Sequence, residues 1–250
     1  MATHFECVGF PLRGREEEGD RLRGLVRSVF EQGAAVPAPE GFHAASWESP
    51  EGIALFAGLA EGEGGLEVRC LSPSFLGACR ARARIFRTVP DPSCPFCDFL
   101  HGEVLRPGGG EGEPFFAEIR DGAFARDLDL RGAEAAVGLS LLAQNVRAFR
   151  DREEFLARRP AGVAAGSLLA TGLLAAPHRP RARAAGAVLA PRLLANPLGG
   201  GRFWHARLAA DAAEVDVLAA EEDLPGGLPE GAVLLAEGTL VARFPEGLPS

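Results

Sequence analysis

Two closely spaced cysteines, Cys94 and Cys97 in the sequence Cys-Pro-Phe-Cys, are the residues of this chain best suited to chemistry. Such a pair can exchange thiols and disulfides, or it can supply half of a zinc site. The remaining candidate zinc ligands are Cys70, Cys79 and His101, although a second closely spaced pair is missing. A redox pair normally begins a helix in a βαβ unit, and the residues after Cys97 are not typical of a helix. We therefore favour unreacted loop thiols and no cofactor, with zinc binding and redox chemistry as alternatives.

The prolines around this pair lead to a specific expectation about the two thiols. Pro92 and Pro95 stiffen the segment, so we expect a loop in which both thiols are at least partly accessible to solvent. If the thiols are idle, replacing both with serine should leave the melting temperature nearly unchanged. If they hold structural zinc, the same replacement should release the metal and cost several kcal/mol, because metal binding is then coupled to folding.

No complete catalytic motif accompanies the cysteines, so catalytic residues stay unknown from sequence. Gly-x-Ser-x-Gly, P-loop and His-Glu-x-x-His patterns are missing from the sequence. The formal charge of −8 disfavours a general nucleic-acid or anionic-membrane binder. Phe203 and Trp204 lie between Arg202 and Arg207, which would suit stacking on single-stranded nucleic acid. However, alternation places the two rings on opposite faces of a strand, and acidic residues follow closely, so nucleic-acid binding is disfavoured.

The elements predicted for the first third of the chain begin with a strand at 4–10 and a helix that starts near Glu16. Apolar residues recur at helical spacing in this helix, at Leu22, Leu25, Val26, Val29 and Phe30. Three strands are predicted next, at 42–47, 53–59 and 66–71. The Ser-Pro-Glu-Gly sequence from Ser49 to Gly52 forms the turn between the first two of them.

This β-α-β-β-β order resembles one unit of the vicinal oxygen chelate fold, the glyoxalase and dioxygenase superfamily. The turn at Ser49–Gly52 is similar to the Asp-Pro-x-Gly turn of that superfamily. The resemblance implies a metal-binding histidine at the start of the first strand, where His4 stands, and a glutamate in the strand after the turn. That strand has no carboxylate from Ile53 to Ala57. One histidine does not make an open metal site, so we interpret His4 as structural or exposed.

Further strands are predicted at 81–89, 102–105, 115–119 and 137–149, with a loop at 90–99 and buried strand and turn within 161–177. A second helix is predicted from Asp151, which serves as its N-cap. From Gly186 onward we predict a hairpin that turns between Asn196 and Gly201. A strand containing Glu214 and Asp216 follows, with one wet and one dry face, and then a strand interrupted by a bulge at Gly238.

The C-terminal order of motifs resembles the end of a family of bacterial proteins that has no established activity and an OB-type barrel at its C-terminus. The motifs are Gly-x-Val from Gly186, Asn-Pro-Leu-x-Gly from Asn196, Phe203-Trp204 and the acidic-Val-Asp-Val segment from Glu214. Thr3–Pro11 and Cys70–Phe75 are similar to landmarks of the same family. This resemblance implies a fold and no chemistry.

Together these patterns predict an α+β fold, with a mostly antiparallel N-terminal domain at 1–155 and a small OB-like β-barrel at 161–250. The first domain could comprise two βαβββ-like halves, 1–80 and 81–155. All 26 positively charged side chains are arginines and lysine is absent, which is typical of a GC-rich genome. The N-terminal residues do not have the pattern of a secretory signal, so we expect a cytoplasmic protein with free thiols.

We interpret the chain as a binding or interaction protein whose partner is unknown and could be a protein, with no membrane span. One alternative is a glyoxalase-like small-molecule binder or enzyme. Another is single-stranded nucleic-acid binding by the barrel.

Overall fold

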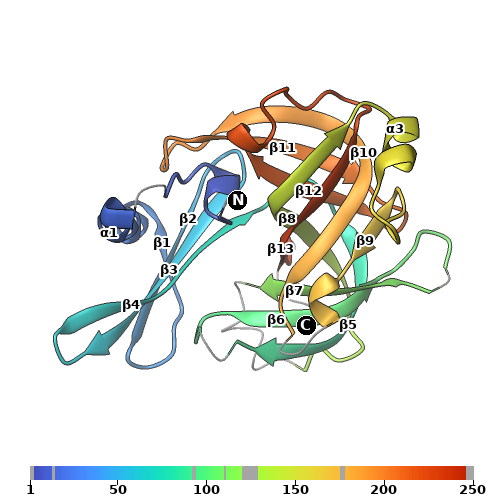
Figure 1. The fold of residues 1–250 in the computed structure, drawn as a ribbon. Coiled ribbons are helices and arrows are strands. Elements are labelled where there is room, and N and C mark those ends of the chain that lie inside the picture. Colours follow the sequence, from blue (N-terminus) through green and yellow to red (C-terminus); the bar gives the residue numbers. More distant parts are fainter. Residues whose placement is uncertain are drawn as a thin grey trace.

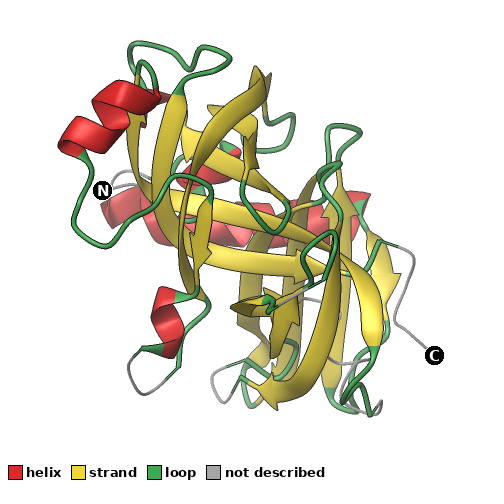
Figure 2. Cartoon of the chain, turned by 90° about the vertical axis from the view of Figure 1, so that its right-hand side faces the viewer, coloured by secondary structure: helices red, strands yellow, loops and turns green. Residues whose placement is uncertain are grey.

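A computed structural model describes residues 3–12, 15–91, 94–109, 111–119, 129–174 and 178–245, with side chains of the helical residues 15–17 left undescribed. Within these ranges the chain forms thirteen β-strands and two α-helices, arranged around two sheets (Figures 1 and 2). The fold is therefore richer in β-structure than the α+β class that we predicted. None of the described helices is long and apolar enough to cross a membrane.

The first sheet has four antiparallel strands in the order β1-β2-β3-β4. Their bounds are Ala34–Val36, Phe42–Glu48, Ile53–Gly62 and Gly65–Phe75 for β1 to β4. Helix α1 (Arg15–Gln32) packs against β2 and β3, with Val26 and Val29 buried (Figure 1). Helix α1 and strands β2, β3 and β4 confirm the predictions for the region, whereas β1 was not predicted. The apolar stripe of α1 explains its docking.

The predicted first strand at 4–10 is wrong. Glu6–Val8 forms a single 3₁₀ turn, η1, which ends at Gly9 with a left-handed φ of 73°. A Cβ atom at Gly9 would lie 2.7 Å from the carbonyl oxygen of Gly201, so the close approach of two backbones also requires glycine here. The segment is apolar because it is buried between the two sheets, and burial of this kind does not require a strand. The β-α-β-β-β unit consequently lacks its first strand.

The second sheet has nine strands in the order β11-β12-β8-β5-β6-β7-β13-β10-β9. The first five along the chain are β5 (Ala81–Pro90), β6 (Asp98–Val104), β7 (Glu113–Ile119), β8 (Glu134–Phe149) and β9 (Ser167–Leu169). The other four are β10 (Arg181–Ala195), β11 (Arg202–Ala209), β12 (Glu214–Ala220) and β13 (Val233–Arg243). The sheet is mixed, because β8–β12 and β7–β13 are parallel pairs. Strand β10 also pairs with β11, and β8 with β13.

The expectation that the C-terminal strands form a small barrel of their own is wrong. Strand β8 pairs with β12 and β13 from the C-terminal part and with β5 from the preceding part. Its central residues, 137–143, are all buried, as expected for an interior strand with neighbours on both sides. The nine-stranded sheet thus contains strands from both sides of the predicted boundary at 155–161, and the domain boundaries stay predictions.

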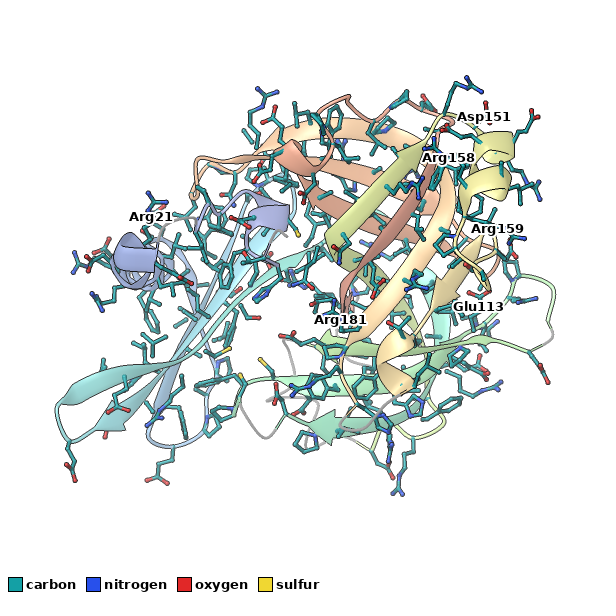
Figure 3. The ribbon with its side chains drawn as sticks, viewed as in Figure 1. Arg21, Glu113, Asp151, Arg158, Arg159 and Arg181 are labelled. Carbon is teal, nitrogen blue, oxygen red and sulfur yellow. The ribbon has the colours of Figure 1, made fainter. Side chains whose placement is uncertain are left out.

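Several local predictions for this sheet are confirmed. Asn196 turns the β10–β11 hairpin, where its Oδ1 accepts hydrogen bonds from the N–H groups of Leu198 and Gly199. The register of β13 against β8 shifts between Glu237 and Gly238, at the predicted bulge. A Cβ atom at Gly238 would lie 1.9 Å from the carbonyl oxygen of Leu142, so no larger residue fits without a shift. Helix α3 (Arg152–Arg158) begins after Asp151 as predicted (Figure 3).

The N-terminal segment joins the two sheets. The Cys7 thiol donates a hydrogen bond to the carbonyl oxygen of Ala143 on β8, at 2.9 Å. The Asn196 side-chain amide donates to the carbonyl oxygen of Val8, at 2.6 Å. Apolar residues of η1, α1, β2 and β3 share one buried core with residues of β8, β11, β12 and β13. The two sheets therefore form one packed body.

Candidate functional site

Cys94 and Cys97 lie in a short turn between β5 and β6. The N–H of Cys94 donates to the carbonyl oxygen of Asp91, and the N–H of Cys97 donates to the carbonyl oxygen of Cys94, each at 3.3 Å. This turn brings the two Sγ atoms to 2.9 Å. The predicted loop at 90–99 is shorter than expected because β6 begins at Asp98, and Pro92 falls outside the described residues.

A third cysteine completes the group. Cys70 lies on β4, in the other sheet, and its Sγ is 3.6 Å from the Sγ of Cys97. The sulfur atoms of Cys70, Cys94 and Cys97 all lie within 4.8 Å of one another, and we call these three residues the thiol cluster. Cys70 was one of the candidate ligands named from sequence, although no spacing rule selected it over Cys79.

The register of β4 explains why Cys70 reaches the cluster. Pairing with β3 shifts between Gly58 and Leu59, so that Leu59 is opposite Val68 while Gly58 is opposite Cys70. Val68 therefore lines a groove together with residues of α1, whereas Cys70 packs with Cys94 and Cys97. A bulge that redirects one side chain is a common feature of strands near functional sites.

Phe96, between the two loop cysteines, anchors the turn on the first sheet. Its ring is 1% exposed and contacts the rings of Phe42 and Phe56, with centroids 5.4 and 5.5 Å away. Gly58 leaves the space for this ring, because a Cβ atom there would lie 2.2 Å from a ring carbon of Phe96. The thiol cluster consequently lies where the two sheets meet.

The expectation that the loop thiols are accessible is wrong. Cys94 is 8% exposed, Cys97 is 2% exposed and Cys70 is 8% exposed. The sequence did not reveal that Phe96 packs against the neighbouring sheet, so that the turn containing both thiols is buried.

The other residues singled out from sequence lie elsewhere. His101 on β6 contacts the rings of Phe86 and Phe116, with centroids 5.4 and 6.1 Å away. The third residue of the thiol cluster is Cys70, and His101, the other candidate ligand, is not part of the cluster. Partial burial lowers the pKa of His101, and the nearby Arg87 lowers it further. His4 packs its ring against Phe5, with centroids 4.7 Å apart.

The geometry of the thiol cluster is close to that of a metal site. A tetrahedral ion with metal–sulfur bonds of about 2.3 Å holds its sulfur ligands roughly 3.8 Å apart. The Cys70–Cys97 separation of 3.6 Å matches this spacing, while the Cys94–Cys97 separation of 2.9 Å is shorter. Thiolate ligands favour soft ions such as Zn²⁺ and Cu⁺. A small expansion of the turn would therefore give the spacing of a metal site. A small contraction would allow a Cys94–Cys97 disulfide.

A second polar group, which sequence reasoning missed, is buried beneath the segment between the two sheets. His205 on β11 and Asp216 on β12 are 2% and 1% exposed, and His205 Nε2 is 2.7 Å from Asp216 Oδ1. The second oxygen, Oδ2, accepts a hydrogen bond from the backbone N–H of Cys79, at 3.2 Å. The His205 ring packs against Phe75, with centroids 4.8 Å apart.

This finding corrects the prediction of a wet face for β12. Asp216 alternates with Val215 and Val217 as expected, but β12 is covered on both faces, so the carboxylate is buried with His205 as its partner. The alternation itself could not reveal this, because a paired buried acid and an exposed acid give the same sequence pattern.

The buried pair does not prepare Cys79 for nucleophilic attack. Burial raises the pKa of the Cys79 thiol above its usual range, and the neighbouring Asp216 carboxylate raises it further. Asp216 lies between the cysteine and His205, with one carboxylate oxygen toward each. A catalytic cysteine needs the opposite environment, in which a positive neighbour stabilises the thiolate. The arrangement therefore has a structural character.

Comparison with known proteins adds no identification: no family model matches the chain, and neither the curated proteins nor the solved structures contain a match.

Proposed function

We propose that the protein is a binding protein rather than an enzyme, and that its ligand is a soft metal ion of the zinc class held by the thiol cluster. The observation that carries this proposal is the convergence of three sulfur atoms within 4.8 Å from two different sheets. Sets of cysteine thiolates are common ligands of structural zinc ions.

The cluster is buried in a group of apolar side chains that includes Ala44, Phe56 and Phe96. An ionised group is costly to bury among apolar side chains unless a counter-charge accompanies it. A divalent cation offsets this cost, because the ligating thiols are deprotonated outright when the metal binds.

The ion would join the two sheets. Cys70 belongs to β4, whereas Cys94 and Cys97 lie in the turn that leads into β6. Metal binding would therefore contribute to the free energy of folding, as it does in structural zinc sites. Three protein ligands leave one position of a tetrahedral ion for a further donor, while a three-coordinate Cu⁺ ion would need none.

Metal analysis of freshly purified protein tests the proposal. We expect about one zinc ion per chain, with loss of the ion in Cys70→Ser, Cys94→Ser and Cys97→Ser. Cys7→Ser is the matched control, because Cys7 is equally buried but donates its hydrogen bonds to the carbonyl oxygens of Thr3 and Ala143. A wild-type protein that binds neither Zn²⁺ nor Cu⁺ under reducing conditions would exclude the proposal, as would retention of the ion by Cys70→Ser.

Thiol–disulfide chemistry at Cys94 and Cys97 is a second candidate, favoured by the 2.9 Å separation of their sulfur atoms. Oxidation would form one S–S bond, with two electrons and two protons passing to an oxidant such as a small disulfide. Mass spectrometry without reduction distinguishes the two candidates, since the disulfide form is two hydrogen atoms lighter and cannot bind the ion through those sulfurs.

A further inference from the structure

A cavity of about 820 Å³ opens on the side of the nine-stranded sheet, away from the thiol cluster. Strand β5, the segment before it, the loop after β6 and the β11–β12 turn form its walls. Four arginines and two glutamates line it: Arg80, Arg82, Arg84, Arg106, Glu134 and Glu214. We call this the arginine cavity, and its volume is in the range of small-molecule sites.

Strand alternation explains the concentration of charge on one wall. Along β5, Ala81, Ala83 and Ile85 are buried in the core, which directs the intervening Arg82 and Arg84 outward. Two guanidinium groups thus stand on the same face of one strand, two residues apart. These two residues supply half of the four arginines that line the cavity.

The carboxylates near the cavity only partly compensate these arginines. Arg82 and Arg84 share one carboxylate, Glu134, and Arg84 also contacts Glu103 at 2.8 Å. Arg106 is paired with Glu113 at 3.4 Å, so three of the four lining arginines have a carboxylate partner. The other lining acid, Glu214, is paired with Arg207 at 3.2 Å. These are exposed ion pairs, and such pairs contribute little stability, so an incoming anion can replace them.

Arg80 is held in place by backbone carbonyl groups, and among the described residues no carboxylate forms an ion pair with it. Its Nη1 atom donates to the carbonyl oxygens of Gly77 and Cys79, at 2.7 and 2.8 Å. These two bonds orient the guanidinium at the cavity wall, and they involve neutral carbonyl oxygens rather than a carboxylate. A guanidinium that is positioned in advance can form charge-assisted hydrogen bonds with an oxyanion at low entropic cost.

We propose that the arginine cavity binds a small molecule carrying a multiply charged oxyanion, through Arg80, Arg82 and Arg84. The oxyanion displaces Glu134 from the two β5 arginines and binds the donors of Arg80 other than those that Nη1 gives to Gly77 and Cys79. Phosphate and carboxylate groups share this chemistry, and the experiment separates them. The site is distinct from the thiol cluster, so either proposal can fail without the other.

Calorimetric titration with pyrophosphate at low ionic strength tests the site, with citrate as the carboxylate probe and sodium chloride at matched ionic strength as the blank. We expect saturable binding of pyrophosphate, about tenfold weaker in Arg80→Gln and in Arg84→Gln, given the usual strength of charge-assisted hydrogen bonds. Arg69→Gln is the matched control, because Arg69 is an exposed arginine on β4 of the four-stranded sheet, where it is paired with Glu67 of the same strand. It should bind like the wild type.

A gain-of-function variant guards against loss of binding through misfolding. Glu134→Gln removes the competing carboxylate, so it should bind the oxyanion severalfold more tightly than the wild type. Stronger binding of citrate than of pyrophosphate would assign the site to carboxylates. The proposal is overturned if the wild type shows no saturable binding of either probe, if Arg69→Gln loses affinity equally, or if Glu134→Gln does not gain affinity.

Discussion

His205 and Asp216 form a buried pair on neighbouring strands, with Nε2 of His205 lying 2.7 Å from Oδ1 of Asp216. The same carboxylate receives the backbone N–H of Cys79, from the segment that connects the two sheets. A Cβ atom at Gly77 would lie 1.9 Å from Asp216 Oδ2, so this segment passes directly over the carboxylate. The pair therefore ties the connection between the sheets to β11 and β12.

Removing this carboxylate should destabilise the fold strongly. Asp216→Ala leaves His205 and the Cys79 N–H without their acceptor, and each buried donor left unsatisfied costs about 1–3 kcal/mol. Urea unfolding followed by circular dichroism measures the change. Glu214→Ala is the control two residues away, and it should cost less than about 1 kcal/mol because its pair with Arg207 is partly exposed. Equal losses in the two variants would contradict a special role for Asp216.

Removal of metal should lower the melting temperature of the wild type. A strong chelator takes the ion from the thiol cluster, and the coupling of binding to folding then appears as a lower transition in calorimetry. Added Zn²⁺ should restore it. Cys97→Ser should melt near the chelated wild type and be insensitive to both treatments, whereas Cys7→Ser should still respond. A wild-type transition that does not move with chelator would show that the cluster contributes no metal-dependent stability.

Gly58→Ala should weaken the contact between the two sheets. The added methyl group meets the Phe96 ring, and overpacking of this kind costs typically about 1–3 kcal/mol. Because Phe96 anchors the turn that contains Cys94 and Cys97, the variant should also bind metal less tightly. Gly64→Ala in the β3–β4 turn has no atom within 4 Å of the new Cβ, so it should change neither property. Unaltered stability of Gly58→Ala would mean that the Phe96 turn is not anchored as described.

Asp151 should stabilise helix α3 in a pH-dependent way. Its Oδ1 accepts the N–H of Glu154 at 2.8 Å, and this bond, together with Arg150, lowers the pKa of the Asp151 carboxyl. Because the folded-state pKa is lower than the unfolded one, the contribution is present above the usual value of 3.8 and is lost as pH falls through the folded pKa.

The corresponding experiment compares urea midpoints of wild type and Asp151→Ala across this pH range. The variant should be less stable near neutral pH, and the difference should shrink on acidification. Asp151→Asn retains an acceptor at the N-cap and should lie between the two. A difference that is constant with pH would show that the carboxylate charge has no part in capping.

Local features of this protein could be predicted from its sequence. The apolar stripe from Leu22 to Phe30 predicted α1, Asp151 was identified as an N-cap, and Gly238 marked a bulge. Each depends on residues within a few positions of one another, where backbone geometry alone relates spacing to structure. Most strands were also found, because alternating and continuous apolar runs need only their own segment to be recognised.

The partners of those segments were decided only by the tertiary structure. Cys70 meets Cys97 across 27 positions of sequence, and Asp216 meets Cys79 across 137. A strand was predicted at 4–10 because a segment buried between two sheets has the same apolar composition as a buried strand. Hydrophobicity specifies that a residue is removed from water, but not which neighbour removes it. Strand pairing and sheet packing supply that information, and they emerge only when the whole chain is folded.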